Sequence, residues 1–237
     1  MKFTLKSFLL LLLGLVLFTF TAYSFSKDKL SSFYKVEAAI DSVPEMLKLP
    51  VSVFDSLRLA EKGLSQDAYE YAMKGFEELK EKGKLRNDSV ITIVDFDQPS
   101  YKKRMYIIDI KNYKLLFNTW SAHGRNSGAA QAKAFSNVPE SYQSSLGLYI
   151  TDMTYSGKHG YSLRLVGLEK INSNALNRAI VLHGAKYVSQ QTINAMGYIG
   201  RSHGCPAVPV ELSKPIIDII KDGTCFFIYN SAYKNVS

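Results

Sequence analysis

The sequence predicts a mainly β fold of the sandwich or barrel-like kind, preceded by a small N-terminal helical segment. From residue 89 onward, short runs rich in Val, Ile, Tyr, Leu and Phe alternate with polar or glycine-containing turns. Over residues 51–84, apolar residues recur instead at helical spacing. The chain has 237 residues, of which 46% are hydrophobic, so it can bury a substantial core.

The N-terminus has the pattern of a targeting segment. Two lysines precede an uncharged run over residues 8–20, and small residues follow that run. This order of charge, short apolar core and small residues is typical of a secretory signal. We therefore predict residues 1–24 to be a signal peptide, with Ala22 and Ser24 at the −3 and −1 positions of its cleavage site. Left uncleaved, the same segment would anchor the protein in a membrane.

The charge of the chain agrees with a location in the periplasm or cell envelope. The formal net charge is +8 at pH 7, and a basic exported protein suits an anionic wall polymer or membrane surface. The positive charges are scattered and form no basic stripe with interleaved aromatic residues. We therefore expect no nucleic acid partner.

Residues 25–88 are predicted to be a linker followed by helices, and residues 89–237 to be the β-rich domain. A short helix is expected near 53–62. A longer one begins after Ser65, a good N-cap, and ends at Gly83. Its buried face is predicted to consist of Ala68, Ala72, Phe76 and Leu79.

The β-rich domain is predicted to hold many short strands and one late helix. The turn of its first hairpin falls at Lys111-Asn112, and Gly223 ends the helix. The expected elements are a strand at 89–96, a hairpin over 104–122, strands at 146–153, 161–168, 178–184 and 224–230, and a helix at 213–223.

All four histidines lie in the β-rich part, and each is followed by glycine. They are His123, His159, His183 and His203. Glycine at such a position allows a sharp turn or the close approach of a ligand. A lone histidine is more often a structural residue than a catalyst, and we interpret His159 in that way.

The stretch "GRSHGCPAVP" contains the candidate nucleophile, Cys205. Gly204 allows a bend and Pro206 favours extended geometry at the cysteine, so the thiol can project beside backbone amides. A thiol needs a general base to react at neutral pH. His203, two residues away, and His183, at the end of a predicted strand, are both candidates, and spacing alone does not choose between them.

Two structural alternatives exist for Cys205. A disulfide with Cys225 fits an oxidising compartment and would abolish the nucleophile, although Cys225 lies in a predicted core strand where a free cysteine acts as a small hydrophobe. A metal site would use His183, His203 and the cysteines, but the paired spacing typical of structural zinc sites is missing. We therefore predict no metal.

The sequence resembles the L,D-transpeptidase catalytic-domain family, whose members are exported enzymes that remodel bacterial peptidoglycan. "VLHGAKYV" at 181–188 followed by "SHGC" at 202–205 is similar to the family signature, and "VDFDQPSYKKRMYIIDIKNYKLLFNTWSAHGRNSG" resembles its opening strands. "SSLGLY" stands where the family often has Thr-Pro-x-Gly-x-Phe. "CPAVP" is similar to a divergent murein-transpeptidase branch, since Pro206-Ala207 replace a hydrophobic residue and Asn or Arg. The resemblance covers roughly residues 89–229.

This resemblance implies a role for each residue of the motif. Cys205 would be the nucleophile and His183 its general base, with the backbone carbonyl of Gly184 orienting the imidazole. The amides of Gly204 and Cys205 would contribute to an oxyanion hole, and His203 would support the site. The implied fold is the β-rich catalytic fold of the family, over residues 89–237, and no metal or organic cofactor is implied.

The resemblance implies a two-step reaction on peptidoglycan stem peptides. The thiolate would attack the carbonyl of the L-centre of a diamino acid in a tetrapeptide and expel the terminal D-alanine. The resulting thioester would pass to an amine, giving a 3–3 cross-link, or to water. The alternatives are an L,D-carboxypeptidase-type hydrolase and a non-catalytic wall-binding module on the same fold.

Arginine is the residue we expect to hold substrate carboxylates, because its guanidinium pairs with them bidentately. Arg125 and Arg201 are the leading candidates, and His123 and Asn126 share the loop of Arg125. Ser202, beside Arg201, completes the predicted substrate-binding set. The wider set of candidate arginines is Arg125, Arg164, Arg178 and Arg201.

Overall fold

The computed structural model describes residues 51–235 of the chain. The predicted signal peptide and most of the predicted linker lie outside the described residues. Over the described range, no helix combines the length and the apolarity that crossing a bilayer requires.

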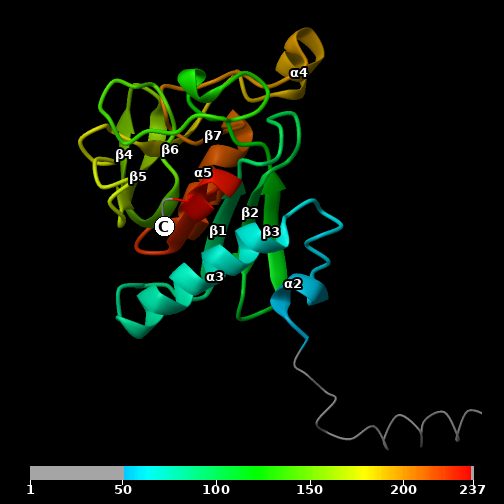
Figure 1. Cartoon of the computed structure of the whole chain (residues 1–237), viewed down its shortest axis with the longest axis vertical. Coiled ribbons are helices and arrows are strands. Elements are labelled where there is room, and N and C mark those ends of the chain that lie inside the picture. Colours follow the sequence, from blue (N-terminus) through cyan, green and yellow to red (C-terminus); the bar gives the residue numbers. More distant parts are fainter. Residues whose placement is uncertain (1–50, 236–237) are drawn as a thin grey trace, which may run out of the picture. The chain divides into compact units, whose positions relative to one another are not determined.

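One eight-stranded sheet forms the centre of the fold (Figure 1). Its spatial order is β3-β2-β1-β8-β4-β5-β6-β7, and only the β1–β8 and β6–β7 pairs are parallel. A bridge between Ala122 and Ala207 joins the chain after β3 to β7, so the two edges of the sheet approach each other. The mainly β, barrel-like prediction is confirmed. The strands are β1 (Val90–Asp95), β2 (Met105–Asp109), β3 (Lys114–Thr119), β4 (Gly147–Gly157), β5 (Gly160–Gly167), β6 (Val181–Gly184), β7 (Ala207–Val208) and β8 (Cys225–Tyr229).

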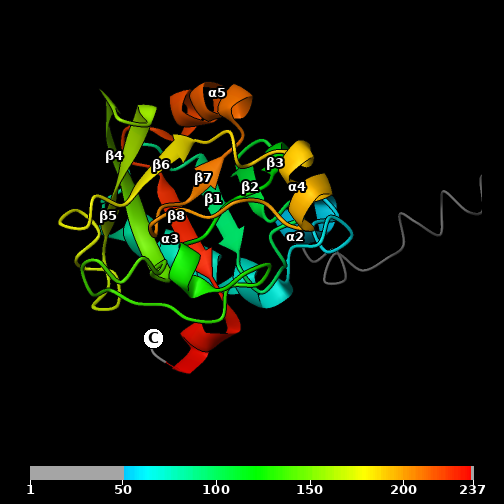
Figure 2. The ribbon, with the colours of Figure 1, turned by 90° about the horizontal axis from the view of Figure 1, so that it is seen from above.

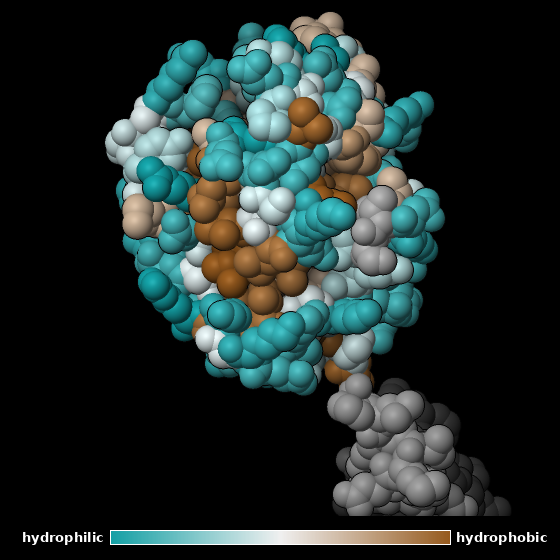
Figure 3. Space-filling view, turned by 60° about the vertical axis from the view of Figure 1, so that its left-hand side comes forward, coloured by the Kyte–Doolittle hydropathy of each residue, from teal (hydrophilic) through white to brown (hydrophobic). Residues whose placement is uncertain are grey.

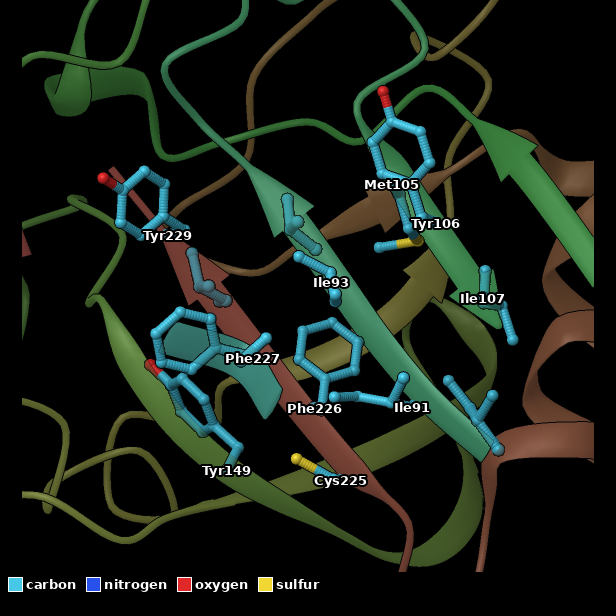
Figure 4. Close-up of a cluster of buried hydrophobic side chains, with 14 of the residues drawn as sticks. Ile91, Ile93, Met105, Tyr106, Ile107, Tyr149, Cys225, Phe226, Phe227 and Tyr229 are labelled. Carbon is cyan, nitrogen blue, oxygen red and sulfur yellow. The ribbon is translucent and has the colours of Figure 1, made fainter. Parts of the chain in front are cut away.

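The core is centred on β1 and β8, whose residues are all buried. Figure 4 shows Ile91 and Ile93 of β1 beside Phe226 and Phe227 of β8, with Cys225 at the end of the same cluster. The continuous apolar run of β8 is what a strand buried on both faces requires. Both cysteines of the chain are free. The disulfide alternative is therefore wrong, because Cys225 packs in the core as a small apolar residue.

Helix α3 (Gln66–Glu81) forms as the sequence predicts. Its N-cap is Ser65, whose hydroxyl accepts a hydrogen bond from the Ala68 amide at 3.2 Å. The helix packs on β1 and β8, so its buried face belongs to the same core as the strands. It thus joins the β-rich domain, although we predict a boundary after residue 88. Its buried residues are the predicted four: Ala68, Ala72, Phe76 and Leu79.

The other helices differ from the prediction in length or existence. Helix α2 is confined to Val53–Ser56, and helix α5 (Val210–Ile220) begins three residues earlier than expected. Helix α4 (Gln190–Met196) is not predicted, because it buries none of its residues and so has no apolar stripe. In Figure 2, α3 and α5 lie on opposite sides of the strands. Two short 3₁₀ helices, Arg125–Ser127 and Ser231–Asn235, complete the structure.

Strands β4 and β5 form one long hairpin that the sequence shows only as two separate runs. Their pairing continues to Gly157 and Gly160, which leaves Lys158 and His159 as a two-residue turn. The strand expected at 178–184 begins at Val181 instead, because the chain before it forms a turn. Apolar side chains also reach the surface, where Figure 3 shows them gathered in a patch surrounded by polar residues.

Candidate active site

Sheet pairing brings the two halves of the motif together. Strand β6 ends in His183-Gly184, and the bend that contains Cys205 leads directly into β7. Because β6 and β7 pair in parallel with His183 opposite Ala207, the histidine and the cysteine come to one cavity. This cavity, called here the Cys205 cavity, has a volume of about 150 Å³ and is lined by His159, His183, Tyr187, Arg201, Ser202, His203 and Cys205.

The imidazole of His183 is held in one orientation and one tautomer. Its Nδ1 lies 3.0 Å from the carbonyl oxygen of Gly184, and because a carbonyl only accepts, Nδ1 carries the proton. Nε2 is left able to accept a proton. Burial lowers the pKa of His183, the Gly184 carbonyl opposes this effect, and His159 lowers the pKa further. His183 is therefore neutral at pH 7, as a general base must be.

His159 lies on His183, although we predict it to be a structural residue. The two rings are stacked, with centroids 4.3 Å apart and an angle of 24° between their planes. The turn of the β4–β5 hairpin carries His159 to this position, and the side chain lines the Cys205 cavity. The pairing register of the hairpin determines this contact, and a single strand pattern does not reveal it.

The thiol of Cys205 is half-buried and lies beside a polar wall. Its S–H donates to the carbonyl oxygen of Ala179 at 3.5 Å. Burial raises the pKa of the Cys205 thiol, while the backbone amide of Val181, the guanidinium of Arg178 and the amide of Cys205 itself lower it. The site thus rests as a neutral thiol beside the neutral imidazole of His183 rather than as an ion pair.

Gly204 adopts a conformation that a side chain would not tolerate. Its φ is +125°, and an added Cβ would lie 2.8 Å from the carbonyl oxygen of Gln143. Its N–H donates to Ser202 Oγ at 3.0 Å, and its carbonyl accepts from Ser144 Oγ at 3.1 Å. The Ser202 hydroxyl in turn donates to the Cys205 carbonyl at 2.6 Å. The Gly204 amide, which we predict in an oxyanion hole, is therefore engaged within its own loop.

His203 lines the cavity, and its ring packs against Tyr142, which lies outside the cavity lining. His203 is exposed, and the two rings meet edge-on with centroids 4.7 Å apart. The guanidinium of Arg125 lies 4.0 Å from the centre of the same tyrosine ring. His203 is thus fixed by aromatic packing, whereas His183 is fixed by a backbone hydrogen bond.

The predicted substrate-binding loop is only partly at the cavity. Arg201 lines it and donates to the carbonyl oxygens of Arg125 and Gly128, at 3.3 and 3.1 Å. Arg125 and Asn126 are exposed and do not line it. Asn126 instead donates to the carbonyl oxygen of Ser141 at 2.9 Å, which fixes one loop against another.

His123, which shares the predicted substrate-binding loop, does not line the cavity. It is fully buried, and Arg104 donates to its Nδ1 at 2.7 Å. Nε2 therefore carries the proton and donates to the carbonyl oxygen of Gly128 at 3.3 Å. Burial, followed by the charge of Arg104, lowers the pKa of His123 to about 4. We call Arg104 and His123 the buried pair.

Arg104 also donates to two backbone carbonyls. Nε and Nη2 donate to the carbonyl oxygen of Ser121 at 3.0 and 2.8 Å, and Nη1 donates to that of Gln98 at 2.8 Å. The sequence gives no sign of this arginine as a partner of His123, because the two residues are 19 positions apart and belong to different segments.

Neither of the remaining candidate arginines lines the Cys205 cavity. Arg164 lies 5.4 Å from the centre of the Tyr155 ring, and Arg178 donates to the segment over residues 136–145. Across residues 51–235, no three His, Cys, Asp or Glu side chains are arranged to hold one metal ion.

Comparison with known proteins gives a family match. Residues 60–229 match the family described as L,D-transpeptidase catalytic domain. A comparison with curated proteins finds no match.

Several solved structures similar to this chain are L,D-transpeptidases. One from Mycobacterium smegmatis is 11% identical with a TM-score of 0.39, over 60% of this chain and 59% of that chain. L,D-transpeptidase 3 from Mycobacterium tuberculosis is 13% identical with a TM-score of 0.39, over 60% and 61%. One from Stackebrandtia nassauensis is 16% identical with a TM-score of 0.36, over 60% and 56%. The chain thus covers about three fifths of the length of these proteins.

Proposed function

Because the chain belongs to the L,D-transpeptidase catalytic domain family, we propose that it is a cysteine-dependent peptidoglycan transpeptidase acting on stem tetrapeptides. One observation carries the proposal. Cys205 and His183 line the same cavity, and the Nδ1 bond of His183 to the Gly184 carbonyl leaves Nε2 able to take a proton. A thiol and a base held in this way can exchange an amide bond in two transfers without a cofactor.

The first transfer forms a thioester. The Cys205 thiol gives its proton to Nε2 of His183, and the sulfur attacks the carbonyl carbon of the L-centre of the diamino acid. The C–N bond to the terminal D-alanine then breaks, and the departing amine takes the proton back from His183. Arg201, the arginine at the cavity, is assigned to a carboxylate of the stem peptide.

The oxyanion that forms during this step needs hydrogen-bond donors. We assign the Cys205 amide as one donor. The Gly204 amide can act as a second donor once it leaves Ser202 Oγ, to which it donates in the resting structure. One such donor is worth about 3 kcal/mol of transition-state stabilisation in other acyl-transfer enzymes.

The second transfer determines the product. An amine on another stem peptide attacks the thioester carbonyl, releases the Cys205 thiol and leaves a 3–3 cross-link. If water attacks instead, the product is a tripeptide and the protein acts as an L,D-carboxypeptidase.

Intact-mass measurement after incubation with a carbapenem tests the nucleophile directly, because the β-lactam carbonyl acylates a reactive thiol. The wild type should gain one adduct and Cys205→Ala none. Cys225→Ala is the matched control, since Cys225 is buried in β8, and it should still be acylated. A wild type without an adduct, or an adduct that survives Cys205→Ala, contradicts the proposal.

Digestion of incubated sacculi identifies the reaction. New 3–3 dimers support transpeptidation, and new tripeptides alone indicate hydrolysis. If the stem peptides stay unchanged while Cys205→Ser still binds sacculi as tightly as the wild type, the protein is a wall-binding module instead.

We further propose that the protein is exported to the periplasm or cell envelope. Support comes from the charge and hydropathy pattern of residues 1–24. Fractionation with mass analysis of the mature N-terminus tests this proposal, with cleavage expected before Phe25. Recovery in the cytoplasmic fraction with residues 1–24 intact would contradict it.

A further inference from the structure

Arg178 makes an unusual set of contacts in the turn before β6. Nη1 donates to the carbonyl oxygen of Ser136 at 2.6 Å and to Ser145 Oγ at 3.0 Å. Nη2 donates to the carbonyl oxygen of Gln143 and to Ser141 Oγ, the latter at 3.3 Å. All four acceptors belong to one segment, residues 136–145, and none of them is a carboxylate. The guanidinium therefore ties this segment down while its positive charge stays uncompensated by these partners.

The same guanidinium lies against the bend that holds the thiol. The position of an added Cβ on Gly204 is 3.1 Å from Nη2 of Arg178 and 2.8 Å from the carbonyl oxygen of Gln143. Arg178 and its acceptor thus form the wall against which Gly204 packs. Gly204 immediately precedes Cys205, so this wall packs against the residue that carries the chain to the thiol.

The residue after Arg178 touches the sulfur itself. Ala179 has a φ of +52°, which is uncommon and costly for a residue with a Cβ. This conformation brings its carbonyl oxygen to 3.5 Å from Cys205 Sγ. The backbone amide of Val181, two residues further along the chain, lowers the pKa of the thiol. Residues 178–181 therefore wrap around the sulfur.

The charge of Arg178 acts on Cys205. Burial raises the pKa of the thiol, and the Arg178 guanidinium is among the groups that lower it. Burial likewise lowers the pKa of Arg178, and Tyr149, followed by Cys205, opposes that effect. The other titratable or charged groups that face the thiol across its cavity are His159, His183, Tyr187, Arg201 and His203.

We propose that Arg178 is a positioning residue for Cys205, which fixes the 136–145 segment behind Gly204 and places a positive charge beside the sulfur. This charge would stabilise the thiolate that forms when the Cys205 thiol gives its proton to His183. The proposal rests on Cys205 being the nucleophile. It gives Arg178 a role different from the substrate-carboxylate contact that the sequence predicts.

The test measures the pH dependence of Cys205 alkylation by iodoacetamide in the full chain, followed by intact mass. Arg178→Met removes the charge and the hydrogen bonds, and Arg178→Lys keeps the charge but not the planar fork. We expect Arg178→Met to be alkylated about tenfold more slowly at pH 7, with its rate profile moved to higher pH. Arg178→Lys should stay within about threefold of the wild type, while amides of 136–145 exchange hydrogen faster.

Each outcome bears on the proposal. Equal alkylation of a folded Arg178→Met and the wild type overturns it, as does an Arg178→Lys variant that loses as much reactivity as Arg178→Met. If Arg178→Met does not fold, Arg178→Lys decides alone. A tenfold slower alkylation of Cys205 in Arg178→Lys overturns the role of the charge. Unchanged hydrogen exchange of the amides of 136–145 overturns the role of the planar guanidinium and its hydrogen bonds. Alkylation requires no turnover, so failure of the transpeptidase proposal would appear separately, as a wild type that no carbapenem acylates.

Discussion

The buried pair and the Cys205 cavity contain the same kinds of residue, but the first has a structural role and the second is open for chemistry. Each region places an arginine beside a titratable side chain, Arg104 beside His123 and Arg178 beside Cys205. In the buried pair, both ring nitrogens of His123 are bonded, one to Arg104 and one to the Gly128 carbonyl. Neither ring nitrogen is left free to exchange a proton with a substrate at neutral pH.

The Cys205 cavity leaves that capacity open. Only Nδ1 of His183 is bonded, to the Gly184 carbonyl, and none of the residues that the structure describes bonds to its Nε2. The thiol donates one long hydrogen bond, to the Ala179 carbonyl at 3.5 Å. A histidine–arginine neighbourhood therefore indicates chemistry only where a ring nitrogen is left without a partner and a cavity gives access to it.

The largest effect expected from this contrast is on the rate of acylation. His183→Gln removes the base while keeping a polar side chain of similar reach, so acylation by a carbapenem should slow by about 10²- to 10⁴-fold. His123→Gln is the matched control and should acylate at nearly the wild-type rate while it is folded. Acylation rates are followed by time-resolved intact mass. An equal loss of acylation rate in the two variants would show that the two regions do not differ in their role in the chemistry.

For the free energy of unfolding, we expect the larger effect in the buried pair. Arg104→Met leaves the carbonyls of Ser121 and Gln98 and the His123 nitrogen buried without a donor, which should cost about 3 kcal/mol of unfolding free energy. Lys103→Met, at the exposed neighbouring position, should change it by less than about 0.5 kcal/mol. Urea unfolding measures both. A tolerated Arg104→Met would show that the buried pair contributes little to the fold.

The buried pair also predicts how stability depends on pH. In the folded protein His123 stays neutral down to its pKa of about 4, whereas in the unfolded chain it binds a proton near pH 6.5. Its contribution is thus complete above pH 6.5 and is lost as the pH falls from 6.5 to 4, by up to about 3 kcal/mol. Urea unfolding at a series of pH values checks this, and His123→Gln should lose less over that window.

The smallest effect concerns the stacked histidines. His159 lowers the pKa of His183, so His159→Phe, which keeps a stacking ring, should move the acid limb of the acylation rate to higher pH. At pH 7 the rate should change by less than about twofold, because His183 is already neutral there. Lys158→Met, at the adjacent turn position, is the control. A limb that moves to lower pH would contradict the assignment.

Local patterns in the sequence account for much of the fold and for the centre of the site. Ser65 and its apolar spacing give α3, and the apolar run of β8 marks a buried strand, because each signal is contained in one short stretch. The motif resemblance singles out Cys205, His183 and Gly184, and the β6–β7 pairing brings that set together.

Contacts between distant segments are what a single sequence does not supply. His159 reaches the site through the register of a hairpin, and His123 leaves it because Arg104 supplies a buried donor. Arg178 appears as a substrate ligand in the sequence because nothing there shows the four acceptors of the 136–145 segment. In each case the deciding partner lies many residues away in the chain.

The place of β8 in the sheet has a consequence for the order in which the protein can assemble. The last strand of the chain lies between β1, the first, and β4. A chain that stops before Cys225 therefore holds two groups of paired strands, β3-β2-β1 beside α3 and β4-β5-β6-β7 bearing His183, which meet only through isolated bridges such as Ala122–Ala207 within the described residues. Completion waits for a pairing that spans more than 130 residues, which favours slow, late closure of the barrel. The sheet that carries the cavity is thus completed only when β8 pairs with β1 and β4.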